Sequence, residues 1–323
     1  MEIEMTSLSD SNLSFFEKGS SKILVCEPSS KNFDVFTWIS ENKVFIGEEV
    51  LKYGGLLFRN FDLLSVSEFN RFVQILAPNL LEYVYRSTPR TRLGGKIYTA
   101  TEYPADRTIP LHNESAYSLS WPEKIFFFSV LVASEGGETP ITDSRNIYKK
   151  IDPVIRKKFE EKGVLYVRNY RPGMDLSWQE VFQTDNRDEV EEYCKNHSIE
   201  WEWNRGLSEL TTRQVCQATL SHPQTNENVW FNQAHLFHIS NLDEEARKSL
   251  LEEYGEEHLP RNAFYGDGAS FEKDVLDHIR EIYEQEKIIF KWQEGDIMLL
   301  DNRLMAHGRQ PYQGERKVAV AMA

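Results

Sequence analysis

The stretch IPLHNESAYSLSWPEKIFFFSVLVA (residues 109–133) joins two signals that guide the fold prediction. Its second half, KIFFFSVLVA (124–133), is a continuous run of aromatic and β-branched residues, short enough for a buried strand. Its first half places His112 and Glu114 two positions apart, after a proline. On a strand, side chains at i and i+2 point to the same face, so these two groups would converge on one point. The pair is either half of a metal site or a coincidence in a polar loop.

Outward from this stretch, the hydrophobic pattern predicts more strands than helices. The further predicted strands are 54–61, 163–170, 296–302 and 316–323. The predicted helices are 65–76, 152–163, 242–255 and 270–287. This content favours a mainly β fold with flanking helices, a β-sandwich or jelly roll, over alternating βαβ units. No glycine-rich phosphate loop follows any strand, which argues against a nucleotide-binding fold.

Composition narrows the class of protein. The chain has 323 residues, 40% of them hydrophobic, which is enough for a sizeable core. The formal net charge of −14 disfavours binding to nucleic acid, because counterion release needs clustered Lys and Arg. No apolar run is long enough for a membrane span, and the N-terminus lacks the basic and apolar regions of a secretory signal. We therefore expect a globular protein that binds neither nucleic acid nor membrane.

Domain organisation and location follow from two further features. Residues 1–22 are rich in Ser, Glu and Asp and are predicted to form a flexible N-terminal tail, with a single domain over residues 23–323. Cys26, Cys194 and Cys216 are odd in number and far apart, so they form neither a disulfide framework nor a zinc knuckle. Free thiols in a reducing compartment predict a cytoplasmic protein.

A metal site at His112 and Glu114 needs a third ligand, and His307 fits best. It lies in GDIMLLDNRLMAHGR (295–309), where a strand ends and the chain turns toward a second strand. With it, the set becomes two histidines and one carboxylate, which leaves adjacent coordination positions open, as in non-haem Fe(II) oxygenases. His235 and His238 form another spaced pair, for which a packed aromatic loop is the preferred interpretation over a second metal site.

Several motifs in the right order resemble the TauD/TfdA family of Fe(II)- and 2-oxoglutarate-dependent dioxygenases. Within that family the chain is most similar to the SyrP-like amino-acid hydroxylases, which use His-x-Glu where many relatives use His-x-Asp. The matching stretches are RSTPR (86–90), YTATEYPADRTIPLHNESAYSLSWPEKIFFF (98–128), GGETPITDSR (136–145), VWFNQAHLFH (229–238) and GDIMLLDNRLMAHGRQPYQGERKVAVAMA (295–323). The resemblance implies a double-stranded β-helix (jelly-roll) core.

The resemblance also implies the cofactors and the residues that hold them. Fe(II) would be bound by His112, Glu114 and His307, with 2-oxoglutarate and O2 as co-substrates. Thr139 resembles the family threonine that helps to hold 2-oxoglutarate. The distal carboxylate of 2-oxoglutarate needs a fixed cation, for which a forked guanidinium is best suited. Arg316, nine residues after His307, is the first choice. In several relatives this arginine lies farther after the distal histidine, so Arg309 is kept as a second possibility.

The resemblance also has implications for the reaction and the substrate. Related halogenases replace the metal-binding carboxylate by a small residue, so Glu114 favours hydroxylation of an aliphatic C–H bond, with desaturation as an alternative. The resemblance implies an amino acid or a carrier-bound aminoacyl group as substrate, in specialised-metabolite biosynthesis. The polar residues predicted to meet it are Arg90, Glu102, Asn113 and Asn232. A zinc hydrolase and a non-catalytic cupin-like binding protein remain alternatives, since ligand types alone exclude neither.

Overall fold

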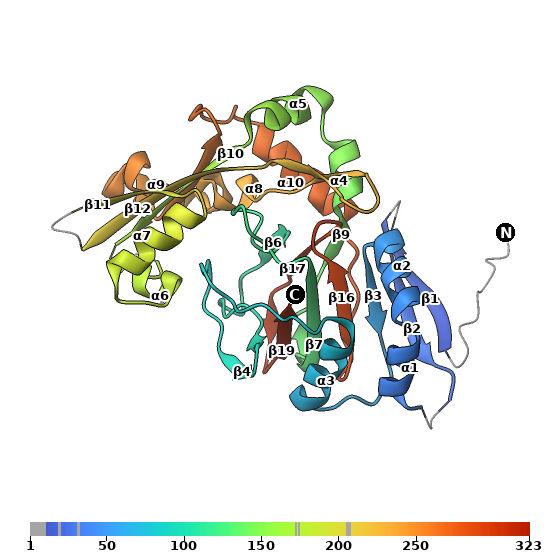
Figure 1. Ribbon diagram of the computed structural model, residues 1–323. Helices are drawn as coiled ribbons and strands as arrows, with labels where there is room; N and C mark the ends of the chain where they lie inside the picture. Colours follow the sequence, from blue (N-terminus) through green and yellow to red (C-terminus); the bar gives the residue numbers. More distant parts are fainter. Residues whose placement is uncertain (1–10, 19–20, 31–32, 172, 174, 205–207) are drawn as a thin grey trace.

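The computed structural model describes residues 11–18, 21–30, 33–171, 173, 175–204 and 208–323. An eight-stranded sheet dominates these residues (Figure 1). Neighbouring strands are antiparallel except β2 and β3, which are parallel. In spatial order they are β1 (Ser11–Lys18), β2 (Ser21–Pro28), β3 (Gly55–Phe58), β16 (Ile297–Asp301), β7 (Lys124–Leu131), β19 (Lys317–Met322), β5 (Ile97–Thr99) and β4 (Arg92–Gly94).

The sheet is buried on both faces, as the aromatic run in β7 predicts. Phe126 and Phe128 point to one face and pack against three helices, α1 (Val35–Glu41), α2 (Lys43–Tyr53) and α3 (Val66–Leu76). On that face the ring of Phe128 stacks on Phe69 of α3, with centroids 5.1 Å apart. Ile125 and Phe127 point to the opposite face. This alternation is the period-two geometry of a strand.

The opposite face is covered by a small antiparallel sheet. Its strand order is β6 (Ile109–His112), β17 (Met305–Arg309), β9 (Ile141–Asp143). Ile141 and Met305 from this sheet share an apolar cluster with Phe127 and Met298 of the large sheet. The small sheet therefore carries His112 and His307 against the middle of the large one. A short antiparallel pair, β8 (Glu135–Gly136) with β18 (Tyr312–Gln313), forms a separate two-stranded sheet.

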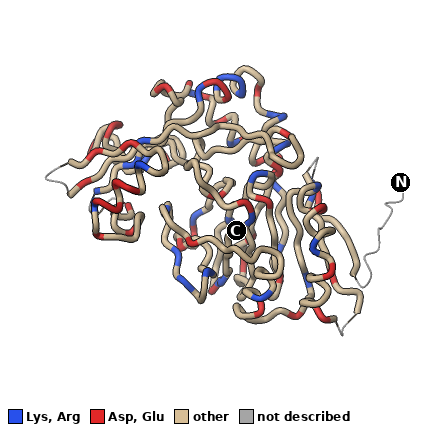
Figure 2. Tube along the Cα trace, in the orientation of Figure 1, with Lys and Arg blue, Asp and Glu red and all other residues tan. Residues whose placement is uncertain are grey.

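A further layer packs around a second core. It contains an antiparallel sheet in the order β11 (Glu200–Asn204), β12 (Glu209–Cys216), β10 (Val164–Tyr170), β15 (Arg261–Tyr265), and a hairpin of β13 (Thr219–Ser221) and β14 (Asn228–Trp230). The helices of this part are α4 (Ser144–Lys150), α5 (Pro153–Lys162), α6 (Trp178–Phe182), α7 (Arg187–Asn196), α8 (Ala234–Phe237), α9 (Glu244–Tyr254) and α10 (Val275–Glu286). Two 3-10 turns, Ile239–Asn241 and Glu256–His258, complete it. Figure 2 shows that both signs of charge are spread along the chain, with acidic residues prominent on α6 and α7.

The predicted mainly β fold with flanking helices is confirmed, and so are the predicted strands and helices, with shifted ends. α3 begins with the expected capping box between Ser65 and Glu68. α10 starts at Val275, later than the predicted 270. The preceding residues are held by tertiary contacts instead, since Phe271 stacks on Phe159 and Glu272 accepts a hydrogen bond from the Tyr265 hydroxyl. Among the described residues, none of the helices combines the length and apolar character needed to cross a bilayer.

The prediction of a flexible tail over residues 1–22 is wrong where the structure describes that segment. Residues 11–18 form β1, which pairs along its whole length with β2, and residues 21–22 begin β2. The prediction rested on the polar composition of this segment and did not include the ring contacts of Phe15 and Phe16. Phe15 meets the Tyr53 ring edge-on at 5.1 Å, and Phe16 stacks on Phe290 at 5.6 Å. Residues 1–10 lie outside the described residues.

Candidate metal centre

The pairing of β6 with β17 brings two histidines together. His112 and His307 are direct cross-strand partners, and their ring centroids are 4.7 Å apart. Glu114 follows β6, and its carboxylate lies with the two imidazoles so that one ligand atom from each residue falls within 4.8 Å of the others. Among the residues that the structure describes, this is the one such group of three.

The position of Glu114 does not arise from the strand spacing on which the prediction was based. β6 ends at His112, so Glu114 lies in a turn and not on the strand. The buried amide of Asn302 holds this turn. Its Oδ1 accepts from the Glu114 backbone N–H at 2.7 Å, and its Nδ2 donates to the Glu114 carbonyl at 2.9 Å. Asn302 was missed as a positioning residue, although its place after the strand ending at Asp301 was the available signal.

His112 is prepared as a neutral ligand. Its Nδ1–H donates to the Pro110 carbonyl at 2.8 Å, which leaves the Nε2 lone pair available for a metal. Burial, aided by the neighbouring His307, lowers the pKa of His112 to about 4. At neutral pH a metal ion would therefore not compete with a proton for this nitrogen.

His307 completes the pair from β17. Its side chain is buried, with Nε2 3.7 Å from Glu114 Oε2. The ring meets the edge of Phe127, with centroids 5.0 Å apart, and its Nδ1 has no hydrogen-bond partner among the described residues.

Glu114 is held ionised by a buried guanidinium. Arg90 Nη2 donates to Glu114 Oε2 at 2.8 Å, and both side chains are 4% exposed. Burial acts to raise the pKa of Glu114, but Arg90 and the two imidazoles outweigh it and hold the pKa well below its usual range. Two imidazoles and one buried carboxylate are a donor set that fits Fe(II) with open positions for co-substrates.

Comparison with known proteins places this site in a family. The profile of the family described as "Taurine catabolism dioxygenase TauD, TfdA family" matches residues 22–322. The chain belongs to the TauD/TfdA family. It is an Fe(II)- and 2-oxoglutarate-dependent dioxygenase, with O2 as the second co-substrate.

Two curated relatives cover most of the chain. The dapdiamide synthesis protein DdaC of Enterobacter agglomerans is 44% identical over 277 residues, 86% of this chain and 84% of DdaC. A clavaminate synthase-like protein of Arabidopsis thaliana is 29% identical over 298 residues, 88% of this chain and 86% of the relative. Among solved structures, PvcB of Pseudomonas aeruginosa, an Fe, alpha-ketoglutarate dependent oxygenase, has a TM-score of 0.60 at 14% identity, covering 99% of this chain and 94% of PvcB. That similarity is one of fold.

Arg316 differs from Arg309 in what its guanidinium contacts. Arg309 donates to three main-chain carbonyls, those of Tyr103, Pro104 and Arg107. Arg316 immediately precedes β19, donates from Nε to the Gly137 carbonyl at 2.8 Å, and has Nη2 3.4 Å from the hydroxyl of Thr139. No carboxylate of the described residues lies within ion-pair distance of Arg316. Burial, with Arg309 nearby, lowers its pKa to about 10, so it is a cation at neutral pH.

The four residues predicted to meet substrate fall into two groups. Arg90 touches the metal centre through Glu114. The other three make internal hydrogen bonds. Asn113 donates to the Asn302 carbonyl at 2.6 Å, Asn232 donates to the Ala218 carbonyl at 2.8 Å, and Glu102 accepts from the Thr99 hydroxyl at 2.9 Å. Their amide and carboxylate groups therefore hold loops, and a role toward substrate stays a prediction.

His235 and His238 do not converge on a metal site. The buried His235 donates from Nε2 to the Leu111 carbonyl at 2.9 Å and stacks on Tyr283, with ring centroids 4.7 Å apart. His238 lies with Nδ1 2.8 Å from the Ser240 hydroxyl. His235 is packed as expected, but residues 234–237 form the helix α8 and not a loop.

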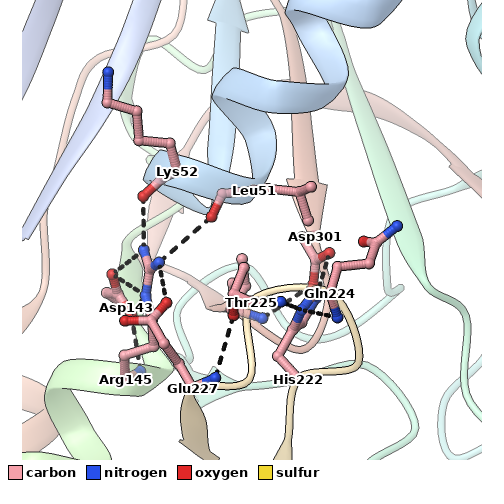
Figure 3. Close-up of polar contacts among 10 residues, drawn as sticks. Leu51, Lys52, Asp143, Arg145, His222, Gln224, Thr225, Glu227 and Asp301 are labelled. Atoms are coloured by element: carbon pink, nitrogen blue, oxygen red, sulfur yellow. Dashed lines mark hydrogen bonds and ion pairs between the residues drawn. The ribbon is translucent and has the colours of Figure 1, made fainter.

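A separate polar network fixes the turn that carries Asn302 (Figure 3). The buried His222 donates from Nε2 to Asp301 at 3.1 Å, since its Nδ1 already accepts from two backbone N–H groups. Beside it, Arg145 pairs with Asp143 at 2.7 Å and Glu227 at 2.9 Å and donates to two main-chain carbonyls at the end of α2. These contacts join the ends of β9 and β16 to the loop after β13, and sequence analysis did not predict them.

Proposed function

We propose that this dioxygenase hydroxylates an aliphatic C–H bond of an amino acid or an aminoacyl group, with His112, Glu114 and His307 as the iron ligands. The observation that carries the proposal is the convergence of the three ligand atoms within 4.8 Å. When bound, Fe(II) with 2-oxoglutarate and O2 supplies the oxidising power for C–H cleavage, while 2-oxoglutarate becomes succinate and CO2.

The chain's own residues have separable tasks in this proposal. His112 and His307 offer imidazole nitrogens, and Glu114 offers an ionised oxygen. Arg316 would bind the distal carboxylate of 2-oxoglutarate, and the Thr139 hydroxyl would orient it. Their contact at 3.4 Å and the lack of an acidic partner for Arg316 among the described residues support this assignment over Arg309.

Hydroxylation is favoured over halogenation because Glu114 is present. A buried, ionised carboxylate fills the ligand position that a chloride ion would need, and its negative charge repels a second anion. The reacting carbon must also be held close and oriented, which the buried setting between two sheets allows.

The fold and the substrate class receive support from the relatives. We infer that the large sheet and the β6–β17–β9 sheet form a jelly-roll core within a single domain over residues 23–323, which agrees with the fold similarity to PvcB. DdaC takes its name from dapdiamide synthesis, which supports an amino-acid-derived substrate in specialised-metabolite biosynthesis. Three buried free thiols support a reducing, cytoplasmic location.

The test is a screen of amino acids, free and carrier-loaded, for succinate production above the uncoupled background. The product is then made under 18O2 with excess chloride and weighed by mass spectrometry. We expect a gain of one labelled oxygen. Loss of two hydrogens would redirect the assignment to desaturation, and a chlorinated product would contradict the role given to Glu114. A protein that produces no succinate with any substrate would return the cupin-like binding protein to consideration.

A further inference from the structure

A small cavity is lined in part by the turn that follows the metal ligand Glu114. Its volume is about 240 Å³, so only a small ligand, or part of a larger one, would fit in it. Tyr83, Tyr117, Trp121 and Met322 form much of its wall, and Ser115, the residue after Glu114, lines it as well. Aromatic and thioether walls suit the apolar part of a ligand and leave its polar groups to a few fixed partners.

Arg90 contacts two residues that line this cavity and also the metal ligand Glu114. Its guanidinium stacks over the ring of Tyr83 at 4.3 Å, and its Nη1 is 3.7 Å from the sulfur of Met322, so it touches two cavity walls. On its other side it donates from Nη2 to Glu114 Oε2. One guanidinium therefore contacts both the cavity lining and the metal centre.

The hydrogen bonding of Arg90 is incomplete. A guanidinium carries five N–H donors, yet one oxygen, from Glu114, accepts from it among the described residues. Nε is buried without a partner, and Nη1 meets only a thioether sulfur, a weak acceptor. Buried donors are normally paired, and neutralising Glu114 uses only one of them. An arginine serving only as counter-charge would be expected to engage both carboxylate oxygens.

We propose that Arg90 binds a free carboxylate of the substrate, whose remaining part occupies the 240 Å³ cavity. This deepens and rests on the proposed oxygenase function. It selects a free acid over a carrier-bound aminoacyl group, because a thioester has consumed the carboxylate that Arg90 would bind. A carboxylate held next to Glu114 also keeps the following one or two carbons of the substrate close to the metal.

The arrangement separates this carboxylate from that of 2-oxoglutarate. Met322, at the cavity, ends β19, while Arg316 directly precedes the first residue of that strand. Between them Val320 pairs with Phe127, whose ring meets His307. Arg90, by Met322, and Arg316, before Lys317, are thus near opposite ends of β19, so the two acids would be held apart.

The test is anaerobic calorimetry on the Fe(II)- and 2-oxoglutarate-loaded protein, where no turnover occurs. The probes are the proteinogenic L-amino acids and, for each, its α-carboxamide, which is similar in shape but neutral. We expect at least one acid to bind about 30-fold or more tightly than its amide, and Arg90→Gln to remove that preference. Arg90→Lys, which keeps the charge but not the fork, should retain part of it.

Two further variants keep the test decisive. Arg92→Gln removes an exposed arginine from the same segment and should bind like the wild type. Ser120→Trp fills the cavity from its lining without touching Arg90, and should weaken binding of the acid while leaving metal and 2-oxoglutarate binding intact. The proposal is wrong if amides bind as well as acids, if no free acid binds, or if only carrier-loaded substrates do. A different result, failure of the protein to form a complex with Fe(II) and 2-oxoglutarate, would contradict the oxygenase function itself.

Discussion

Arg316 is a half-buried cation whose hydrogen-bond partners among the described residues are all neutral. Its Nε donates to a carbonyl and its Nη2 approaches the hydroxyl of Thr139, so no ion pair among the described residues compensates its charge. Burying a charge without an opposite charge is costly, and a co-substrate carboxylate would relieve that cost. This is the physical reason to assign 2-oxoglutarate to Arg316.

We expect Arg316→Ala to weaken 2-oxoglutarate binding roughly 30-fold or more, because a truncated buried pair costs on the order of 2–5 kcal/mol. Fe(II) binding should change little. Titration of 2-oxoglutarate into the Fe(II) protein measures both. Lys317→Ala, which removes the exposed cation next along the chain, is the matched control and should leave the constant unchanged. An unaltered constant in Arg316→Ala would move the role to Arg309 or Lys317.

At the residue level, the sequence predicted ligand types better than ligand placement. His112, Glu114 and His307 were named from spacing and motif order, and the structure brings them together. The reason given for Glu114 was incomplete, because its place depends on the amide of Asn302, more than 180 residues away in the chain. Long-range hydrogen bonds of this kind leave no periodic trace, so a single sequence does not reveal them.

At the level of elements, the close approach of β6 and β17 is what sets His112 against His307. Gly308 allows that approach. A Cβ added there would lie 2.6 Å from the carbonyl oxygen of Ile109 and 3.3 Å from the backbone nitrogen of Leu111. Both are backbone atoms, so the strands themselves would have to separate.

We therefore expect Gly308→Ala to lower Fe(II) affinity at least about tenfold and to destabilise the fold by about 1–3 kcal/mol, the usual cost of overpacking. Fe(II) titration and urea unfolding measure the two effects. Gly47→Ala in α2 is the control, since its Cβ would meet nothing within 4 Å and alanine favours a helix. Unchanged metal affinity in Gly308→Ala would show that this pairing does not position the ligands.

Elements were predictable where local signals decided them. The capping box of α3 and the aromatic run of β7 are local, and both elements lie where predicted. β1 was missed because its polar residues suggested a tail, while its order comes from pairing with β2 and from rings distant in sequence. Tertiary contacts decide such segments, and propensity alone does not contain them.

For the whole molecule, buried histidines predict loss of stability in acid. Burial lowers the pKa of His235 to about 3 and that of His238 to about 4, below the value of about 6.5 in an unfolded chain. Between these values the unfolded chain binds more protons than the folded one. The free energy of unfolding is therefore highest above about pH 6.5 and falls as the pH drops toward 4, by up to about 1.4 kcal/mol per pH unit for each histidine.

His235→Leu should reduce the pH dependence of the free energy of unfolding by the contribution of about one bound proton. The variant should also be less stable overall, because the Leu111 carbonyl loses its hydrogen-bond donor. Urea unfolding at pH values spanning about 5 to 7 measures the slope. His258→Leu, at an exposed site, should leave it unchanged. A slope equal to that of the wild type in His235→Leu would contradict the neutral, buried state assigned to this imidazole.

The central claim is that His112, Glu114 and His307 hold one Fe(II) together with 2-oxoglutarate. Its most direct test is anaerobic titration of Fe(II) into the protein with 2-oxoglutarate, followed by visible absorption. We predict a weak charge-transfer band that saturates at one Fe(II) per chain and is absent from the folded His307→Ala variant. A wild-type protein without the band, or a His307→Ala variant with the full band, would contradict it.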